Sequence, residues 1–183
     1  MWTQEHRERH RQCGNGFPSD LTDAERERLA PLVPAASPGG RPRKTDMRAA
    51  MNAILYLLRT GCPWRYLPRD GFPPLSTVYN IFRKFQREGT WEAIWAELHL
   101  ALRERLGREA SPRAFLSMEI VRRSDDTRGF VVQPRRWVVE RCFSWFGRNR
   151  RLAKDYENLA DTLAAFVAIA SIRLALKRLA RLG

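Results

Sequence analysis

Apolar residues at helical spacing, interrupted by glycine and proline, restrict this sequence to a mainly helical fold. Residues three and four positions apart lie on one face of a helix. The chain keeps apolar residues at that spacing in five segments, at about residues 22–33, 46–59, 76–88, 90–106 and 161–181. A further helix is expected from Pro134 to Phe146, and two short strands at 119–121 and 130–132. We therefore predict a mainly α protein.

Cap residues indicate where these helices begin and end. Thr22 and Glu25 have the spacing of a capping box, in which each side chain accepts a hydrogen bond from the other residue's backbone N–H. Asp46, Ser76 and Thr90 are expected to cap the next three helices, and Gly61 to end the second. In the last helix, the expected solvent-facing residues are Arg173, Lys177 and Arg181.

The charge of the chain favours a polyanionic partner. The formal net charge is +13 over 183 residues, and arginine far outnumbers lysine. Arginine suits bidentate contacts to phosphate and guanine, which favours DNA, although charge alone would also suit RNA, a ribosome or an anionic membrane surface. The three cysteines lie far apart, and the charged N-terminus has no apolar run. We therefore expect a protein of the reducing cytoplasm, without a membrane partner.

The segment from residue 41 to 88 has the form of a helix-turn-helix-like DNA-binding unit. Its second helix carries apolar residues on one side and polar or basic residues on the others, as a recognition helix does. The connector between the two helices is about fourteen residues long, much longer than the usual turn. The segment begins with an arginine-rich arm, which precedes the first of the two helices. The predicted DNA-binding residues here are Arg41, Arg43 and Lys44 in the arm and Asn80, Arg83, Lys84 and Arg87 in the helix. Taken alone, the helix is better explained as a solvated basic face, and the adjacent arm turns the interpretation toward DNA contact.

A second basic block runs from Arg122 to Lys154. It contains ten Lys or Arg residues and three acidic residues. Glu140 lies four positions after Arg136, a spacing that allows an ion pair on a helix. The carboxylate is either part of a structural ion pair or a metal ligand, and one carboxylate does not make a two-metal site. Arg150 and Arg151, in the basic turn that follows, are further DNA-binding candidates.

Both regions resemble bacterial insertion-sequence transposases of the four-and-five superfamily, in its four-hundred-and-two-like branch. The N-terminal resemblance is carried by N-A-I-L-Y-L-L-R-T-G-C-P-W-R-Y-L-P and S-T-V-Y-N-I-F-R-K-F. The C-terminal one is carried by G-F-V-V-Q-P-R-R-W-V-V-E-R-C-F-S-W-F-G-R-N-R-R-L-A-K-D-Y-E. The resemblance covers roughly residues 20–112 and 119–180.

The resemblance implies an incomplete catalytic site. It identifies Glu140 with the glutamate of a DDE triad on a ribonuclease-H-like fold, flanked by Arg136 and Arg148 at basic positions. The segments that carry the two catalytic aspartates of the family are missing between the two regions. The intact family uses Mg²⁺ or Mn²⁺, so Glu140 would bind metal only if another chain completed the site. We therefore expect this chain to be catalytically inactive by itself.

These observations predict three regions: a disordered tail at 1–19, a helical DNA-binding domain at 20–107, and a truncated helical remnant of the catalytic domain at 108–183. The expected partner is double-stranded DNA at the ends of the element. Homo-oligomers or an intact transposase are further candidate partners. The protein could act as a regulator that competes for element ends or as a subunit of a mixed oligomer, or it could have no selected role.

Overall fold

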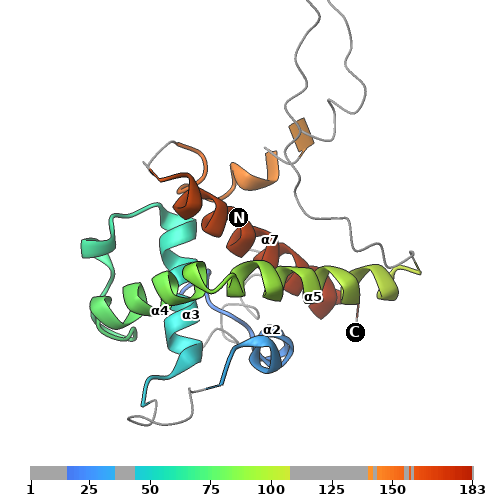
Figure 1. The fold of residues 1–183 in the computed structure, drawn as a ribbon, viewed down its shortest axis with the longest axis horizontal. Helices are drawn as coiled ribbons and strands as arrows, with labels where there is room; N and C mark the ends of the chain where they lie inside the picture. The colour runs from blue at the N-terminus through green and yellow to red at the C-terminus, as the bar shows by residue number, and fades with distance from the viewer. Residues whose placement is uncertain are drawn as a thin grey trace, which may run out of the picture.

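The computed structural model describes residues 16–35, 44–107, 140–141, 144–154, 157 and 159–182, and this part of the chain is mainly helical. Its elements are α2 (Asp23–Leu29), η1 (Ala30–Leu32), α3 (Met47–Thr60), η2 (Trp64–Tyr66), α4 (Leu75–Arg87), α5 (Thr90–Arg105) and α7 (Ala160–Arg181), where η denotes a 3₁₀ helix (Figure 1). Residues 140–141 and 144–146 are also helical, and the described ranges contain no strand. The two strands expected at 119–121 and 130–132 lie outside the described residues. No helix within these ranges is long and apolar enough to cross a membrane.

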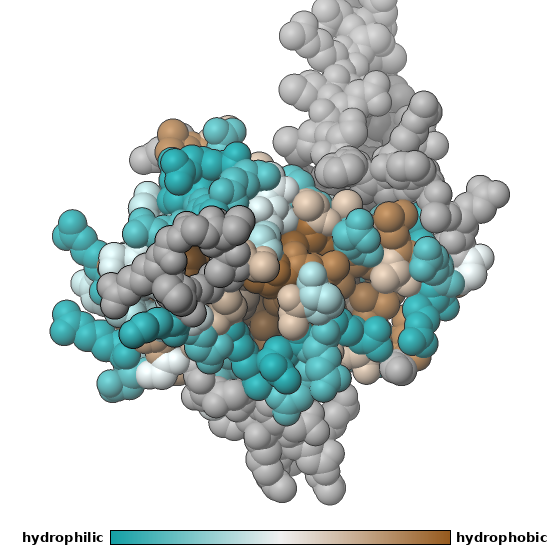
Figure 2. Space-filling model, turned by 60° about the horizontal axis from the view of Figure 1, so that its bottom comes forward, coloured by the Kyte–Doolittle hydropathy of each residue, from teal (hydrophilic) through white to brown (hydrophobic). Residues whose placement is uncertain are grey.

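The last helix lies in the same core as the helices that precede residue 107. In Figure 1, α7 runs alongside α5, with which it has its most extensive contact, and it also packs against α2, α3 and α4. One continuous cluster of buried apolar side chains extends from Leu21 to Leu179. Figure 2 shows apolar residues in the middle of one face of the molecule, with hydrophilic residues on either side. Phe166, Ile169, Ile172 and Leu176 of α7 contribute to this cluster, as their spacing in the sequence predicts.

Aromatic rings hold α4 at the centre of this core. Phe82 of α4 stacks on Phe166 of α7 with the ring centroids 4.9 Å apart. The indole N–H of Trp91, at the start of α5, donates to the backbone carbonyl of Phe82 at 3.3 Å. Trp64 of η2 packs 5.3 Å from Phe82 on a third side. The apolar side of α4 is therefore fixed by three other elements.

Two of the predicted helix starts are confirmed, together with one predicted end. The Thr22–Glu25 capping box is complete, with Thr22 Oγ1 accepting from the Glu25 N–H at 3.3 Å and Glu25 Oε2 accepting from the Thr22 N–H at 2.9 Å. Asp46 caps α3 through the Arg48 N–H at 2.8 Å. Gly61 ends α3 in the left-handed conformation, with φ of 68°.

The caps predicted at Ser76 and Thr90 are wrong. The N-cap of α4 is Pro74, so Ser76 already lies inside the helix. The N-cap of α5 is Gly89, at φ of 65°. This single left-handed glycine both ends α4 and begins α5, which draws Thr90 into the first turn.

Arg173 is buried, whereas the periodicity of α7 predicted a solvent-facing side chain. Its Nη1 lies 2.5 Å from Glu25 Oε2, and its Nη2 donates to the Asp20 backbone carbonyl at 2.9 Å. Both side chains of the ion pair are largely removed from solvent. Lys177 is half-buried, and only Arg181 of the three predicted cations is exposed. Arg173 is buried because the neighbouring helix α2 places its capping carboxylate, Glu25, against this side of α7.

The end of the expected N-terminal tail belongs to the fold. Phe17 stacks on Phe72 at 5.2 Å and meets Tyr56 edge-on at 4.9 Å. Its backbone N–H donates to Asp20 Oδ2 at 3.2 Å, in a turn that leads into the buried Leu21. Residues 16–19 are therefore ordered by packing, and residues 1–15 of the expected tail lie outside the described residues.

Loss of the buried ion pair should strongly destabilise the protein. Replacing Arg173 by Met keeps an apolar side chain but removes the guanidinium that pairs with the buried Glu25 carboxylate. We expect the free energy of unfolding to fall by about 3–5 kcal/mol, as when one partner of a buried pair is removed. Urea denaturation would measure this. Lys84→Met serves as the control, because the exposed Lys84–Glu88 pair, at 3.9 Å, should contribute less than about 1 kcal/mol. Equal losses in both variants would contradict a stabilising role for the buried pair.

Candidate nucleic-acid interface

Helix α4 presents a polar and basic surface opposite its buried side. Val78, Phe82 and Phe85 are buried, whereas Asn80 and Arg87 are exposed. Arg83 and Lys84 are half-buried, and all four predicted side chains lie on the surface of this helix. The spacing of Asn80, Arg83 and Arg87 places these three residues on one face of α4.

These basic side chains are held only by weak local contacts. Arg83 donates to Gln86 Oε1 at 2.8 Å within the same helix. Lys84 lies 3.9 Å from Glu88, a long and exposed ion pair. Such contacts exchange readily for contacts with a ligand, because exposed pairs contribute little free energy. The face can therefore bind an anionic partner at small energetic cost.

The connector between α3 and α4 packs onto α4. Trp64 meets Tyr79 edge-on at 5.2 Å and Phe82 at 5.3 Å, so η2 lies beside the first turns of α4. Helices α3 and α4 also contact each other directly. The long connector is consequently a packed element of the unit.

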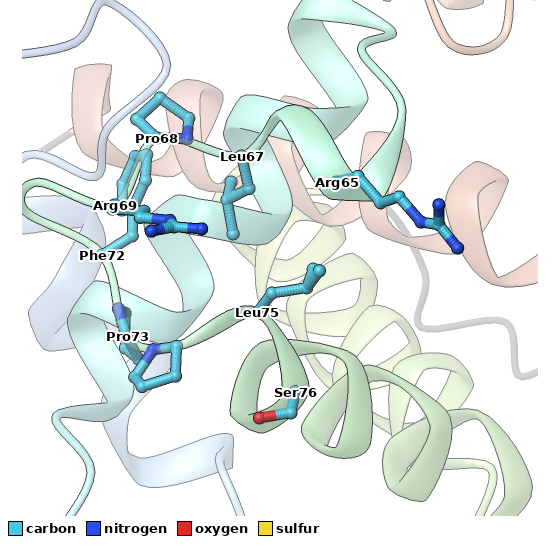
Figure 3. Close-up of a pocket in the computed structure, with 9 residues that line it drawn as sticks. Arg65, Leu67, Pro68, Arg69, Phe72, Pro73, Leu75 and Ser76 are labelled. Atoms are coloured by element: carbon cyan, nitrogen blue, oxygen red, sulfur yellow. The ribbon is translucent and has the colours of Figure 1, made fainter.

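An open hollow of about 540 Å³ lies between the connector and the first turn of α4 (Figure 3). Arg69 extends across it, and the Arg65 side chain points outward from its rim. The lining consists of Arg65, Leu67, Pro68, Arg69, Phe72, Pro73, Pro74, Leu75 and Ser76. None of these side chains is a carboxylate, imidazole or thiol, so the hollow offers cationic groups for anions and no group for acid–base or metal chemistry.

The basic turn at residues 147–151 docks on the C-terminal end of α3. The Arg150 N–H donates to the Arg59 carbonyl, and the Arg151 N–H donates to the Leu58 carbonyl, both at 3.3 Å. Arg59 Nη1 donates in return to the Arg148 carbonyl. Gly61 permits this approach, since a Cβ built there would lie 3.1 Å from the Arg150 backbone. Two basic regions separated by 89 residues are thereby joined.

Arg151, predicted to bind DNA, is a buried structural residue. It is 5% exposed. Its Nε donates to Glu157 Oε1 at 2.6 Å, and its Nη1 donates to the Cys62 carbonyl at 2.9 Å. Its guanidinium carbon also lies 4.6 Å from the centre of the Phe166 ring. This side chain fixes the basic turn to the core, because its donors are already used there.

The other predicted DNA-binding residues are placed only in part. Lys44 is exposed two residues before the α3 cap, and Arg150 is exposed in the basic turn. Arg41 and Arg43 lie outside the described residues, as does Arg136. Neither periodicity nor a motif singles out Arg59 and Arg65, which are exposed at the end of α3 and on the connector. They become candidate DNA-binding residues only through the tertiary contact between α3 and the turn.

Two of the catalytic residues that the resemblance identifies, Glu140 and Arg148, lie at exposed positions. Glu140 is exposed at a helical position followed by Arg141, and Arg148 is exposed in the basic turn. Arg141 and Arg178 both lie over the Trp145 ring, at 5.3 Å and 5.0 Å. Across the described ranges, no three His, Cys, Asp or Glu side chains gather where they could hold a metal ion. Two-metal phosphoryl transfer needs several carboxylates around one pocket, so this set does not fit it.

A partly buried histidine, His99, lies on α5. Burial, reinforced by the charge of Arg103, lowers the pKa of His99 below its usual value. The His99 ring packs 5.1 Å from Trp95. We assign this residue to packing on α5.

The close approach at Gly61 predicts how firmly the basic turn is held. Gly61→Ala should combine left-handed strain with a clash against the Arg150 backbone and destabilise the fold by about 2–4 kcal/mol. Gly89→Ala is the matched control, because Gly89 has a similar φ of 65° and nothing within 4 Å of a built Cβ. It should lose only about 1 kcal/mol. Thermal or urea unfolding of both variants measures the difference, and equal losses would rule out the packing of the turn on Gly61.

Comparison with known protein families gave two matches along the chain. The family model for transposases of the IS4/5 family (DUF4096) matches residues 21–95. A model for the transposase DDE domain matches residues 88–177. Comparison with curated proteins and with solved structures gave no match.

Proposed function

We propose that this chain, which belongs to the IS4/5 family of DDE transposases, binds double-stranded DNA through α4 and does not itself cut or join it. The two family matches support a transposition-related function. The observation that carries the proposal is the surface of α4. It combines exposed Asn80 and Arg87 with Arg83 and Lys84, opposite a side that is fixed in the core.

The chemistry of these side chains suits duplex DNA. A helix fits the major groove, where arginine pairs with guanine O6 and N7 and asparagine with adenine N6 and N7. The buried side of α4 is fixed by Phe166, Trp64 and Trp91, so the polar face is presented by a rigid support. Lys44 and the preceding Arg41 and Arg43 are proposed to form an arm that contacts phosphates or the minor groove. In this arrangement the α3–α4 unit acts as a helix-turn-helix with an extended, packed connector.

The absence of cleavage is proposed from the chemistry of the carboxylates. The Mg²⁺ or Mn²⁺ ions of the intact family need a cage of three carboxylates to activate a nucleophile and to stabilise the leaving oxygen. The segments expected to carry the two aspartates are missing from this sequence, and Glu140 lies among arginines. Glu140 could contribute to a metal site only in a mixed oligomer with an intact transposase.

A binding protein without cleavage activity has a direct consequence for transposition. It would occupy element ends that an intact transposase needs and so reduce the rate of transposition. Regulation by competition is therefore the role that we propose for this chain in a cell that also contains the active enzyme.

Binding by α4 is tested with variants of its polar face. A duplex that carries an element end should be preferred over a scrambled duplex at moderate salt. Asn80→Ala and Arg83→Ala should each reduce that preference by about 1–3 kcal/mol, or roughly 5- to 150-fold, because each removes a bidentate base contact. Arg26→Ala, at an exposed position of α2, should leave the preference unchanged. Fluorescence anisotropy on both duplexes measures it. An unchanged preference in both α4 variants would disprove recognition by α4.

Cleavage is tested by incubating the purified chain with element-end DNA and Mg²⁺ or Mn²⁺. We expect no nicking or strand joining above the level of a protein-free control, and the same result for Glu140→Gln. Gel electrophoresis of end-labelled DNA would detect either product. Metal-dependent cleavage by the wild type that Glu140→Gln abolishes would overturn the proposed inactivity.

A further inference from the structure

The docked basic turn creates a surface that neither half of the chain contains alone. Arg148 and Arg150 of the turn lie at the end of α3 beside Arg59, and all three side chains are exposed. Figure 1 shows this part of the chain at the end of α3 from which the connector to α4 departs. We call Arg59, Arg65, Arg148 and Arg150 together the basic edge.

The position of the basic edge is fixed by backbone contacts. Two backbone hydrogen bonds, from the Arg150 and Arg151 N–H groups, hold the turn on the last turn of α3. Gly61 lets the two backbones meet. The buried Arg151 links the turn to the connector, since it donates to the Cys62 carbonyl and lies 5.8 Å from the Trp64 ring. Arg65 follows Trp64 on the connector, and its exposed side chain points outward (Figure 3).

The basic edge is a concentration of positive charge with no acidic partner in the part of the chain described here. No ion pair is found for any of its four arginines, whereas the more buried Arg151 and Arg173 pair with Glu157 and Glu25. Like charges held together at a surface repel one another unless an anion neutralises them. Several exposed guanidiniums on one fixed surface suit a polymer of phosphates better than a small anion.

The adjoining recognition surface indicates which polyanion this is. The connector that carries Arg65 leads directly into α4 and packs on it through Trp64. A duplex read by α4 would therefore pass close to the edge.

We propose that the basic edge binds the phosphate backbone of the same double-stranded DNA that α4 reads, an inference that rests on the proposed function. The basic turn comes from the C-terminal region, but it then contacts DNA from its docked position on the N-terminal helices. The edge contributes affinity without sequence discrimination, because phosphate contacts position the protein and base contacts specify the site.

The test compares Arg65→Gln/Arg150→Gln with Arg26→Gln/Arg181→Gln. Each double variant removes two positive charges from exposed positions, and the control pair lies on α2 and at the end of α7. Affinity for the element-end duplex is measured from 0.05 to 0.3 M NaCl. Each lost phosphate contact should make the slope of log affinity against log salt shallower by about 0.9, so the edge variant should change it by about 1.8. At 0.1 M salt this corresponds to a roughly 60-fold weaker affinity, with an unchanged ratio between specific and scrambled duplexes.

Each outcome of this test supports or overturns a distinct claim. A shallower slope in the edge variant alone, with a wild-type melting temperature, supports the inference. Equal slopes in the edge and control variants would overturn it while leaving recognition by α4 intact. A loss of affinity for single-stranded RNA but not for duplex DNA would also overturn it. If the wild type shows no preference for element-end DNA, the proposed function itself fails.

Discussion

The guanidinium of Arg173 reaches from α7 to the carboxylate that caps α2, and this contact joins the two ends of the chain. Glu25 is held at the same time by the Thr22 N–H. Neither charge could be buried alone, since an unpaired charge in a protein interior costs several kcal/mol. Helix α7 and the start of α2 are therefore buried together, although 148 residues separate the partners. The apolar residues of α7 are buried in the core beside this contact.

The pairing of acidic residues with buried arginines also determines which arginines remain at the surface. Two acidic residues, Glu25 and Glu157, lie in contact with buried arginines and neutralise them inside the fold. The arginines of the α4 face and the basic edge are left on the outside. The α4 face lies opposite the side on which Phe166 and Trp64 support the helix. Packing and the proposed recognition of DNA use opposite sides of one rigid helix.

Much of this architecture could be predicted from local sequence signals. The capping box at Thr22, the Asp46 cap, the Gly61 stop and the extent of α7 follow from interactions within a few residues. The polar face of α4 was predictable for the same reason. Periodicity assigns a cation to the solvent side by default, so it does not predict the burial of Arg173. The basic turn predicts a DNA contact for Arg151, whose burial is likewise set by tertiary partners. The grouping of Arg59 and Arg65 with the basic turn could not be predicted, because it depends on the docking of a turn from far along the chain.

Binding and cleavage place different demands on a chain of this family. Cleavage needs three carboxylates held around metal ions within one pocket, and the loss of any of them removes the chemistry. Binding needs only a rigid helix face and a basic surface, which a single compact core can present. Twelve residues of α7 are buried, and the α2–α5 helices cover them without a sheet in the described part of the chain. Because helices α2–α5 already bury this side of α7, the fold that supports α4 does not depend on a complete catalytic domain. Under the function proposed above, this chain keeps the binding step of a transposase and lacks the chemical one.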